Sequence, residues 1–217
     1  MSIVQLDFAE PFFHVEYLEN ESHCRIDQKS MVINLAEREK NNILLPGGRK
    51  IVPLKAAILQ DVEITNLHKA LVVRDFEHCD LTSAETVEAI KKQWKTLYEM
   101  SGIERHKGLP YYKSPKFCTG EGRDHIEINF CYVSKGGVPS GPHRDHDRDF
   151  DEVHAQILGT GMMRIYDCDD REHVHQELPM TAGIVHDRMY DKKGKYPWHE
   201  YMSVTPGIYC PIELDRK

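Results

Sequence analysis

Apolar and other residues alternate along most of the second half of the chain. The stretch "DHIEINFCYV" places Ile126, Ile128, Phe130 and Tyr132 at every second position, which is the period of a strand with one apolar face. Short apolar runs joined by Gly, Pro and Asp turns follow: "EVHAQILG", "GMMRIYDC", "HVHQELPM", "AGIVH", "EYMSVTPG" and "IYCPIEL". Many short strands at close, regular spacing predict an all-β sandwich or barrel over residues 121–217.

The first 120 residues carry shorter apolar runs and one helical pattern. Between residue 3 and about residue 76, runs such as "KIVPLKAAILQDVEI" and "HKALVVRDF" recur at intervals that suit strands. Thr82 and Glu85 stand in capping-box spacing at the start of "LTSAETVEAIKKQWKTLYEMSG", which ends near Gly102. This stretch predicts one amphipathic helix over residues 82–102, with an apolar stripe that packs on the core: Val87, Ile90, Trp94, Leu97 and Tyr98.

The Gly/Pro-rich stretches have the length of loops and not of linkers. They are "LLPGGRK" and "SKGGVPSGP", and the chain contains no internal repeat or low-complexity tract. A length of 217 residues with 40% hydrophobic content suits one sizeable core. We therefore expect a single domain over residues 1–217, with an N-terminal extension over 1–120 and a β-barrel core over 121–217.

Charge and hydropathy narrow the classes of partner. The formal net charge is −7, and no run of lysines or arginines is spaced to follow a phosphate backbone, so nucleic acid is not an expected partner. The N-terminal residues lack a basic segment followed by a long apolar one, and no eighteen uncharged apolar residues stand together. The sequence predicts a cytoplasmic protein that does not enter a membrane and that binds a small molecule.

The candidate chemistry begins with three polar residues at alternate positions. In "DEVHAQILG", Glu152, His154 and Gln156 share one face of the expected strand, and apolar residues take the other face. The polar face meets either bulk water or an enclosed cavity. The histidine-rich stretch "GPHRDHD" immediately upstream favours the cavity, because it offers further metal ligands.

These further ligands are imidazoles and carboxylates. His143, Asp145 and His146 lie in a loop or strand end that could fold back on Glu152, and His186 ends the short run "MTAGIVH". Imidazole nitrogen and carboxylate oxygen together suit Fe(II), Mn(II), Zn(II), Ni(II) or Cu(II). The absence of paired cysteines argues against a closed structural zinc centre.

The region from about residue 125 to residue 217 resembles the cupin superfamily of metal-dependent double-stranded β-helix proteins. Its first motif has a glycine seven residues after a glutamate, as Gly159 follows Glu152, and its second has a glycine three residues before a histidine, as Gly183 precedes His186. The resemblance implies a jelly-roll barrel with a divalent metal ion inside, most often Fe(II), Mn(II), Zn(II) or Ni(II). The implied ligands are His143, His146, Glu152, His154 and His186.

The sequence departs from the cupin pattern at one point. Cupins usually place His-x-His three to five positions before the glutamate, whereas His143 and His146 are separated by two residues and His146 precedes Glu152 by six. The difference implies a bulge, or the replacement of one imidazole ligand by Asp145 or His154.

The segment "YPWHEYMSV" contributes candidates around the metal. His199 is expected to contact substrate or transfer a proton, because its ordinary pKa lies near neutrality. We predict Glu152, His154 and His199 as catalytic residues, and Gln156, Tyr196 and Trp198 as substrate-binding residues. Barrel edge strands are often shielded by association, which favours a homodimer.

These features together predict a metal-dependent cupin enzyme for a small polar metabolite, with an Fe(II)-type oxygenase placed first. An isomerase, epimerase or lyase for a sugar-like substrate is the next candidate, and a non-catalytic ligand-binding cupin is the third. An iron and 2-oxoglutarate oxygenase could use His143 and Asp145 with His186 or His199. Such enzymes usually carry a cation about ten residues after the distal histidine. Tyr209 stands there after His199, whereas the cations near His186 are Lys192, Lys193 and Lys195, in an expected loop.

Overall fold

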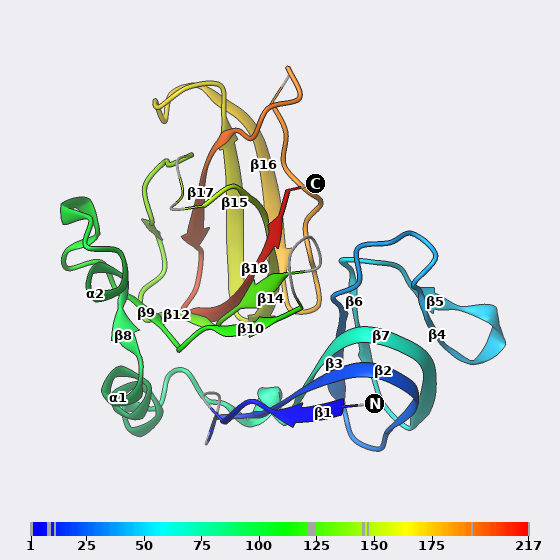
Figure 1. Ribbon diagram of the computed structural model, residues 1–217. Coiled ribbons are helices and arrows are strands. Elements are labelled where there is room, and N and C mark those ends of the chain that lie inside the picture. The colour runs from blue at the N-terminus through cyan, green and yellow to red at the C-terminus, as the bar shows by residue number, and fades with distance from the viewer. Residues whose placement is uncertain are drawn as a thin grey trace. The chain divides into compact units, whose positions relative to one another are not determined.

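The computed structural model describes residues 2–7, 10, 12–120, 125–144, 146, 148–191 and 193–216. Asp145, a candidate ligand, lies outside these residues. The described chain is mainly β, as the sequence predicts, and it divides into two compact units (Figure 1). Unit 1 contains Met1–Asp80 and Gly183–Val185, and unit 2 contains Leu81–Ala182 and His186–Lys217. None of the helices within the described residues is long and apolar enough to cross a bilayer.

Unit 1 is built on one antiparallel sheet. Its strands lie in the order β1 (Ser2–Gln5), β2 (His14–Ile26), β7 (Val62–Arg74), β3 (Ser30–Asn34) and β6 (Ala56–Leu59). Two shorter strands, β4 (Ile43–Leu44) and β5 (Lys50–Ile51), pair with each other, and β4 also pairs with β7. Short 3-10 turns occur at Pro46–Gly48 and Phe76–His78.

The core of unit 1 comes from the apolar runs that predict its strands. Ile26, Val32, Ile64 and Val72 have no exposed surface and pack in one cluster. Burying a side chain of this size contributes about 1.5–3 kcal/mol to folding. Because Ile26 lies on β2 and Ile64 and Val72 lie on β7, this burial stabilises the pairing of the two strands. The strands expected between residues 3 and 76 are therefore confirmed.

Unit 2 starts with two helices over the range where the sequence predicts one. Helix α1 (Ala84–Gln93) ends because Trp94 takes an extended conformation, with φ −105° and ψ 147°. The two-residue strand β8 (Lys95–Thr96) follows, and helix α2 (Leu97–Ser101) begins at a capping box in which Thr96 and Glu99 satisfy each other's backbone N–H groups. The N-terminal cap of α1 is Ser83, whose side chain accepts a hydrogen bond from the Thr86 backbone.

The remaining strands of unit 2 form two antiparallel sheets. The first has the order β10 (Phe117–Thr119), β11 (Ile126–Ile128), β18 (Gly207–Asp215), β12 (Cys131–Val133), β9 (Tyr111–Lys113) and β8, and β14 (Phe150–Leu158) also pairs with β18. The second has the order β13 (Val138–Pro139), β17 (Trp198–Ser203), β15 (Thr160–Tyr166) and β16 (Val174–Thr181). A 3-10 turn at Glu104–His106 precedes β9.

The two sheets form the layers of a jelly roll with a shared interior (Figure 1). Tyr111 and Cys131 of the first sheet pack in one cluster with Met163, Ile165 and Tyr201 of the second. The β-barrel core expected from the sequence is thus the architecture of this unit. Unit 2 starts before the predicted boundary at residue 121, because β9 and β10 belong to the same sheet as β12 and β11.

Candidate metal centre

Four side chains of unit 2 converge in the interior of the barrel. His143, His146, Glu152 and His199 each offer one ligand atom, and these atoms all lie within 4.8 Å of one another. Glu152 comes from β14 and His199 from β17, whereas His143 and His146 belong to the segment between β13 and β14. Residues from three parts of the sequence therefore meet at one point.

A short piece of strand pairing places His143 opposite His199. The backbone N–H of each residue donates to the carbonyl oxygen of the other, at 2.9 Å in both cases. The two ring centroids lie 4.4 Å apart. This isolated bridge extends the β13–β17 pairing past Pro142 and turns both imidazoles to the same side.

Backbone carbonyls fix the proton on the rear nitrogen of two of these rings. His143 Nδ1 donates to the carbonyl oxygen of Gly141 at 3.0 Å, and His199 Nδ1 donates to that of Pro197 at 3.1 Å. When a ring with this arrangement is neutral, its unprotonated Nε2 is the atom that remains to bind a metal. Such a hydrogen bond behind the ring is what usually orients a metal-binding histidine.

His146 completes the cluster from its more open side. Its ring stacks on Phe150, with centroids 4.4 Å apart and planes 17° from parallel. The rings of Tyr196 and His199 meet it edge-on, each at 5.5 Å between centroids. The packing fixes the plane of the His146 imidazole although the residue is only partly buried.

The ionisation states of Glu152 and His143 favour the binding of a cation. Burial alone would raise the pKa of Glu152, but the neighbouring imidazoles of His154, His199 and His146 hold it well below its ordinary value. Burial, helped by the proximity of His199, lowers the pKa of His143 to about 3. Near neutral pH the site therefore holds a carboxylate and an unprotonated His143 imidazole, which are the forms that bind metals.

The donor set fits one divalent ion. Metal–ligand bonds to imidazole nitrogen and carboxylate oxygen are about 2.0–2.2 Å long, so two donors of one ion lie at most about 4.4 Å apart. Donors within 4.8 Å of one another need only a small contraction. Three imidazoles and one carboxylate suit Fe(II), Mn(II), Zn(II), Ni(II) or Cu(II), and the geometry does not choose among them.

His154 and His186 lie behind Glu152 and contact each other. Nε2 of His186 accepts hydrogen bonds from the His154 backbone N–H at 2.9 Å and from His154 Nδ1 at 3.0 Å, and its own Nδ1 donates to the Asp187 carbonyl at 2.7 Å. His154 Nε2 lies 3.4 Å from Glu152 Oε1. Among the described residues, the structure thus brings together His143, His146 and Glu152 of the predicted ligands, with His199 in place of His154 and His186.

The three predicted substrate-binding residues have different surroundings. Tyr196 lines the pocket described below, whereas Trp198 packs its ring under the Arg144 guanidinium at 5.1 Å. Gln156 is fully buried: its side-chain oxygen accepts from the Tyr201 hydroxyl at 2.7 Å, and its amide donates to the Leu158 carbonyl at 2.7 Å. Both ends of the Gln156 side-chain amide are therefore hydrogen-bonded within the barrel.

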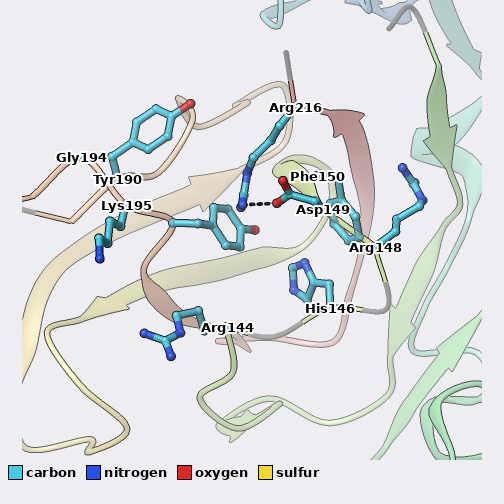
Figure 2. Close-up of a pocket in the computed structure, with 10 residues that line it drawn as sticks. Arg144, His146, Arg148, Asp149, Phe150, Tyr190, Gly194, Lys195 and Arg216 are labelled. Carbon is cyan, nitrogen blue, oxygen red and sulfur yellow. Dashed lines mark hydrogen bonds and ion pairs between the residues drawn. The ribbon is translucent and has the colours of Figure 1, made fainter. Parts of the chain in front are cut away.

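A pocket of about 800 Å³ opens beside the cluster (Figure 2). His146 belongs to both, and Tyr196 and Phe150, which pack on His146, also line the pocket. The other lining residues are Arg144, Arg148, Asp149, Tyr190, Gly194, Lys195 and Arg216. Sequence reasoning named Lys195 only as a cation near His186 and did not single out Arg144, Arg148 or Arg216. The four cations come from the loop before β14, the loop before β17 and the C-terminal end, with no shared motif.

At the position ten residues after His199, where the 2-oxoglutarate alternative expects a cation, the chain has Tyr209. Tyr209 is buried and stacks on Tyr201, with ring centroids 3.9 Å apart. The carboxylate of the described cluster belongs to Glu152.

Comparison with known proteins gives matches among solved structures only. No protein-family model and no curated protein matches the chain. A cupin from Shewanella frigidimarina, described as RmlC-like, is 14% identical over 51% of this chain and 81% of its own, with a TM-score of 0.35. A cupin 2 conserved barrel domain protein from Salinispora arenicola is 17% identical over 48% and 76%, with a TM-score of 0.33. A variant of salicylate 1,2-dioxygenase from Pseudoaminobacter salicylatoxidans is 10% identical over 94% and 70%, with a TM-score of 0.39.

Proposed function

We propose that this chain is a metal-dependent enzyme that acts on a small polar molecule and holds one divalent ion with His143, His146, Glu152 and His199. The observation that carries the proposal is the convergence of these four donors within 4.8 Å inside the barrel, next to a pocket large enough for a metabolite. Two of the imidazoles are already oriented by backbone carbonyls, which is the arrangement of a prepared site.

A bound divalent ion supplies Lewis acidity at this point or, if it is iron, a centre for oxygen chemistry. The chain's own residues position the ligands of this ion. Phe150 and Tyr196 pack on the His146 ring and hold it in place beside the cluster. Oε2 of Glu152 faces His199 Nε2 and Oε1 faces His154 Nε2, each at 3.4 Å, so the carboxylate connects the ligand cluster to the buried pair His154 and His186.

We place an Fe(II)-type oxygenase first, because a site of imidazoles and a carboxylate without cysteine suits Fe(II). The second candidate is an isomerase, epimerase or lyase. It is favoured by the line of groups from Glu152 through His154 to His186, which can hold a proton close to the cluster. A protein that only binds a ligand in the same pocket is the alternative outside catalysis.

The test is metal analysis followed by turnover. Protein purified without chelator or nickel affinity is expected to hold about one divalent ion per chain, and reconstitution of the stripped protein with Fe(II) should produce substrate-dependent oxygen consumption. Turnover without oxygen consumption would favour the isomerase or lyase. Tight ligand binding without turnover under any metal would favour the binding protein, and failure to bind any of these metals would refute the proposal.

A further inference from the structure

A second group of metal-binding side chains lies at strands β10 and β11, and it is called the β10–β11 cluster below. Cys118, His125 and Glu127 each offer one ligand atom, and these atoms all lie within 4.8 Å of one another. Strand register explains why they meet. Cys118 of β10 stands directly opposite Glu127 of β11, and His125 precedes Glu127 by two residues. Directly opposite residues and residues two apart share one face of a sheet, so the three side chains lie together.

The β10–β11 cluster is separate from the four-residue cluster in the barrel. Across the sheet, Glu127 stands opposite Glu213 of β18, and Glu213 stands opposite Glu152 of β14. Neighbouring strands lie about 4.8 Å apart, so two strand spacings, or roughly 10 Å, separate the backbones of Glu127 and Glu152. Among the described residues, none belongs to both clusters. An ion at one cluster therefore leaves the ligands of the other free.

The donors of the β10–β11 cluster suit a transition metal that accepts sulfur. Cys118 is exposed and adds a thiol to an imidazole and a carboxylate, a combination of ligands that Zn(II) takes. His125 Nε2 lies 3.0 Å from Glu127 Oε1, which is within the distance of about 4.4 Å that two donors of one ion can span. An ion at this place replaces the hydrogen bond between these two atoms. Three protein ligands leave a fourth position of a tetrahedral ion open to solvent.

The charges around the β10–β11 cluster favour a divalent cation. Lys116 Nζ lies 2.8 Å from Glu127 and 3.0 Å from Glu213. Arg148 lies 3.2 Å from Glu127 and 2.9 Å from Glu213, and it also pairs with Asp215. Three carboxylates thus face two cations, and a metal-bound thiolate adds a second excess negative charge, which one divalent ion balances. Because Glu213 and Asp215 keep both cations paired, Glu127 can turn an oxygen to the metal.

We propose that Cys118, His125 and Glu127 bind a second divalent transition-metal ion of the Zn(II) type. This site has three protein ligands instead of four, its cysteine is exposed, and its carboxylate is shared with two cations. It is therefore expected to bind more weakly than the four-residue cluster and to fill only in the presence of free metal ion. After desalting, the metal-loaded protein is expected to keep the ion of the four-residue cluster alone.

Titration of the metal-free, reduced protein with Co(II) tests the proposal. A bond between cobalt and a thiolate gives a charge-transfer absorption in the near ultraviolet, which imidazole and carboxylate ligands do not give. With Co(II) in excess, the wild-type protein should show this absorption for about one ion per chain, and added Zn(II) should abolish it by displacing the cobalt. Absence of the absorption in excess Co(II) would overturn the proposal.

Variants assign the ion to the named residues. Cys118→Ser should lose the absorption, whereas Cys168→Ser, which replaces another exposed cysteine of unit 2, should keep it. His125→Ala should weaken Co(II) binding about tenfold or more, whereas the control His173→Ala, at an exposed histidine outside the cluster, should not change it. Persistence of the absorption in Cys118→Ser, or its equal loss in both cysteine variants, would contradict the assignment. Cys118→Ala repeats the test if the serine variant is poorly folded by circular dichroism.

The second site is tested independently of the proposed function. His199→Ala removes a donor of the four-residue cluster and should keep the cobalt–thiolate absorption, because His199 lies outside the β10–β11 cluster. Cys118→Ser should in turn keep the ion of the four-residue cluster after desalting. Loss of the absorption in His199→Ala would show that the thiolate and His199 bind the same ion, and it would contradict a separate site.

Discussion

His143 and His199 are joined by reciprocal backbone hydrogen bonds of 2.9 Å, and their rings lie 4.4 Å apart although 55 positions separate them in the sequence. The pairing brings His199 into the four-residue cluster, with its Nε2 3.4 Å from Glu152 Oε2. His199 lies in the cluster because its strand, β17, pairs with the segment that contains His143.

His199→Ala should lose the metal, whereas His186→Ala should keep it. The first variant removes a donor of the cluster, and loss of one ligand or of its orienting partner commonly weakens binding 10–100-fold or more. The second removes a side chain that contacts His154 and not the cluster. Metal content and affinity, measured by elemental analysis and competition with a chelator, distinguish the two variants. Retention of metal by His199→Ala together with its loss from His186→Ala would restore His186 as a ligand.

His154→Ala should lower stability more than metal binding. Without the His154 side chain, Nε2 of His186 keeps the backbone donor at 2.9 Å but loses the side-chain donor at 3.0 Å, and Glu152 Oε1 loses its neighbour at 3.4 Å, which we expect to cost about 0.5–1.5 kcal/mol. Urea unfolding of the metal-free protein measures this cost. A loss of less than about 0.5 kcal/mol would show that the pair does not contribute to the folded barrel.

The metal-free protein should become less stable as the pH falls from about 6.5 to about 3. Burial lowers the pKa of His143 and of His186 to about 3, against about 6.5 in the unfolded chain. Between these values the unfolded state binds more protons than the folded one, so the unfolding free energy rises with pH, by at most about 1.4 kcal/mol per pH unit for each group.

A matched pair of variants isolates the contribution of His186 to this slope. His186→Gln should flatten the pH dependence of the unfolding free energy, whereas His68→Gln, which replaces an exposed histidine of unit 1, should leave it unchanged. The midpoints of urea unfolding at several pH values provide the measurement. The same slope in both variants would show that His186 titrates normally in the folded protein.

Thr96→Ala should destabilise the protein by about 1 kcal/mol without changing metal content. The substitution removes the hydroxyl that accepts from the Glu99 backbone in the capping box at the start of α2. Thr181→Ala is the control, because Thr181 is exposed at the end of β16 and takes no part in the cap. Urea unfolding compares the two variants, and an equal loss in both would contradict the assigned cap.

The sequence predicts the β architecture because the pattern that indicates a strand lies within a few consecutive residues. The alternation from Ile126 to Tyr132 and around Glu152 is the period of two that a strand requires, and β11, β12 and β14 lie at these places. The interruption of the helix at Trp94 also has a local signal, the Thr96-x-x-Glu99 capping box, which the longer apolar stripe obscured.

Only some residues of the site lie close together in the sequence. His143, His146 and Glu152 stand close in sequence, and the acid-rich motif identifies them. His199 joins them through strand pairing, and the cations Lys195 and Arg216 reach the same pocket from separate segments. Such neighbours follow from which strands pair with each other, and the hydrophobic pattern of one strand does not name its partner.

X-ray absorption spectroscopy of the metal-loaded protein tests the central claim most directly, since it counts the imidazoles bound to the ion. The wild-type protein should show a shell of nitrogen and oxygen donors with the scattering of three imidazoles and no sulfur, and His199→Ala should show two imidazoles or no bound metal. A sulfur ligand, or an unchanged imidazole count in His199→Ala, would contradict the ligand set of His143, His146, Glu152 and His199.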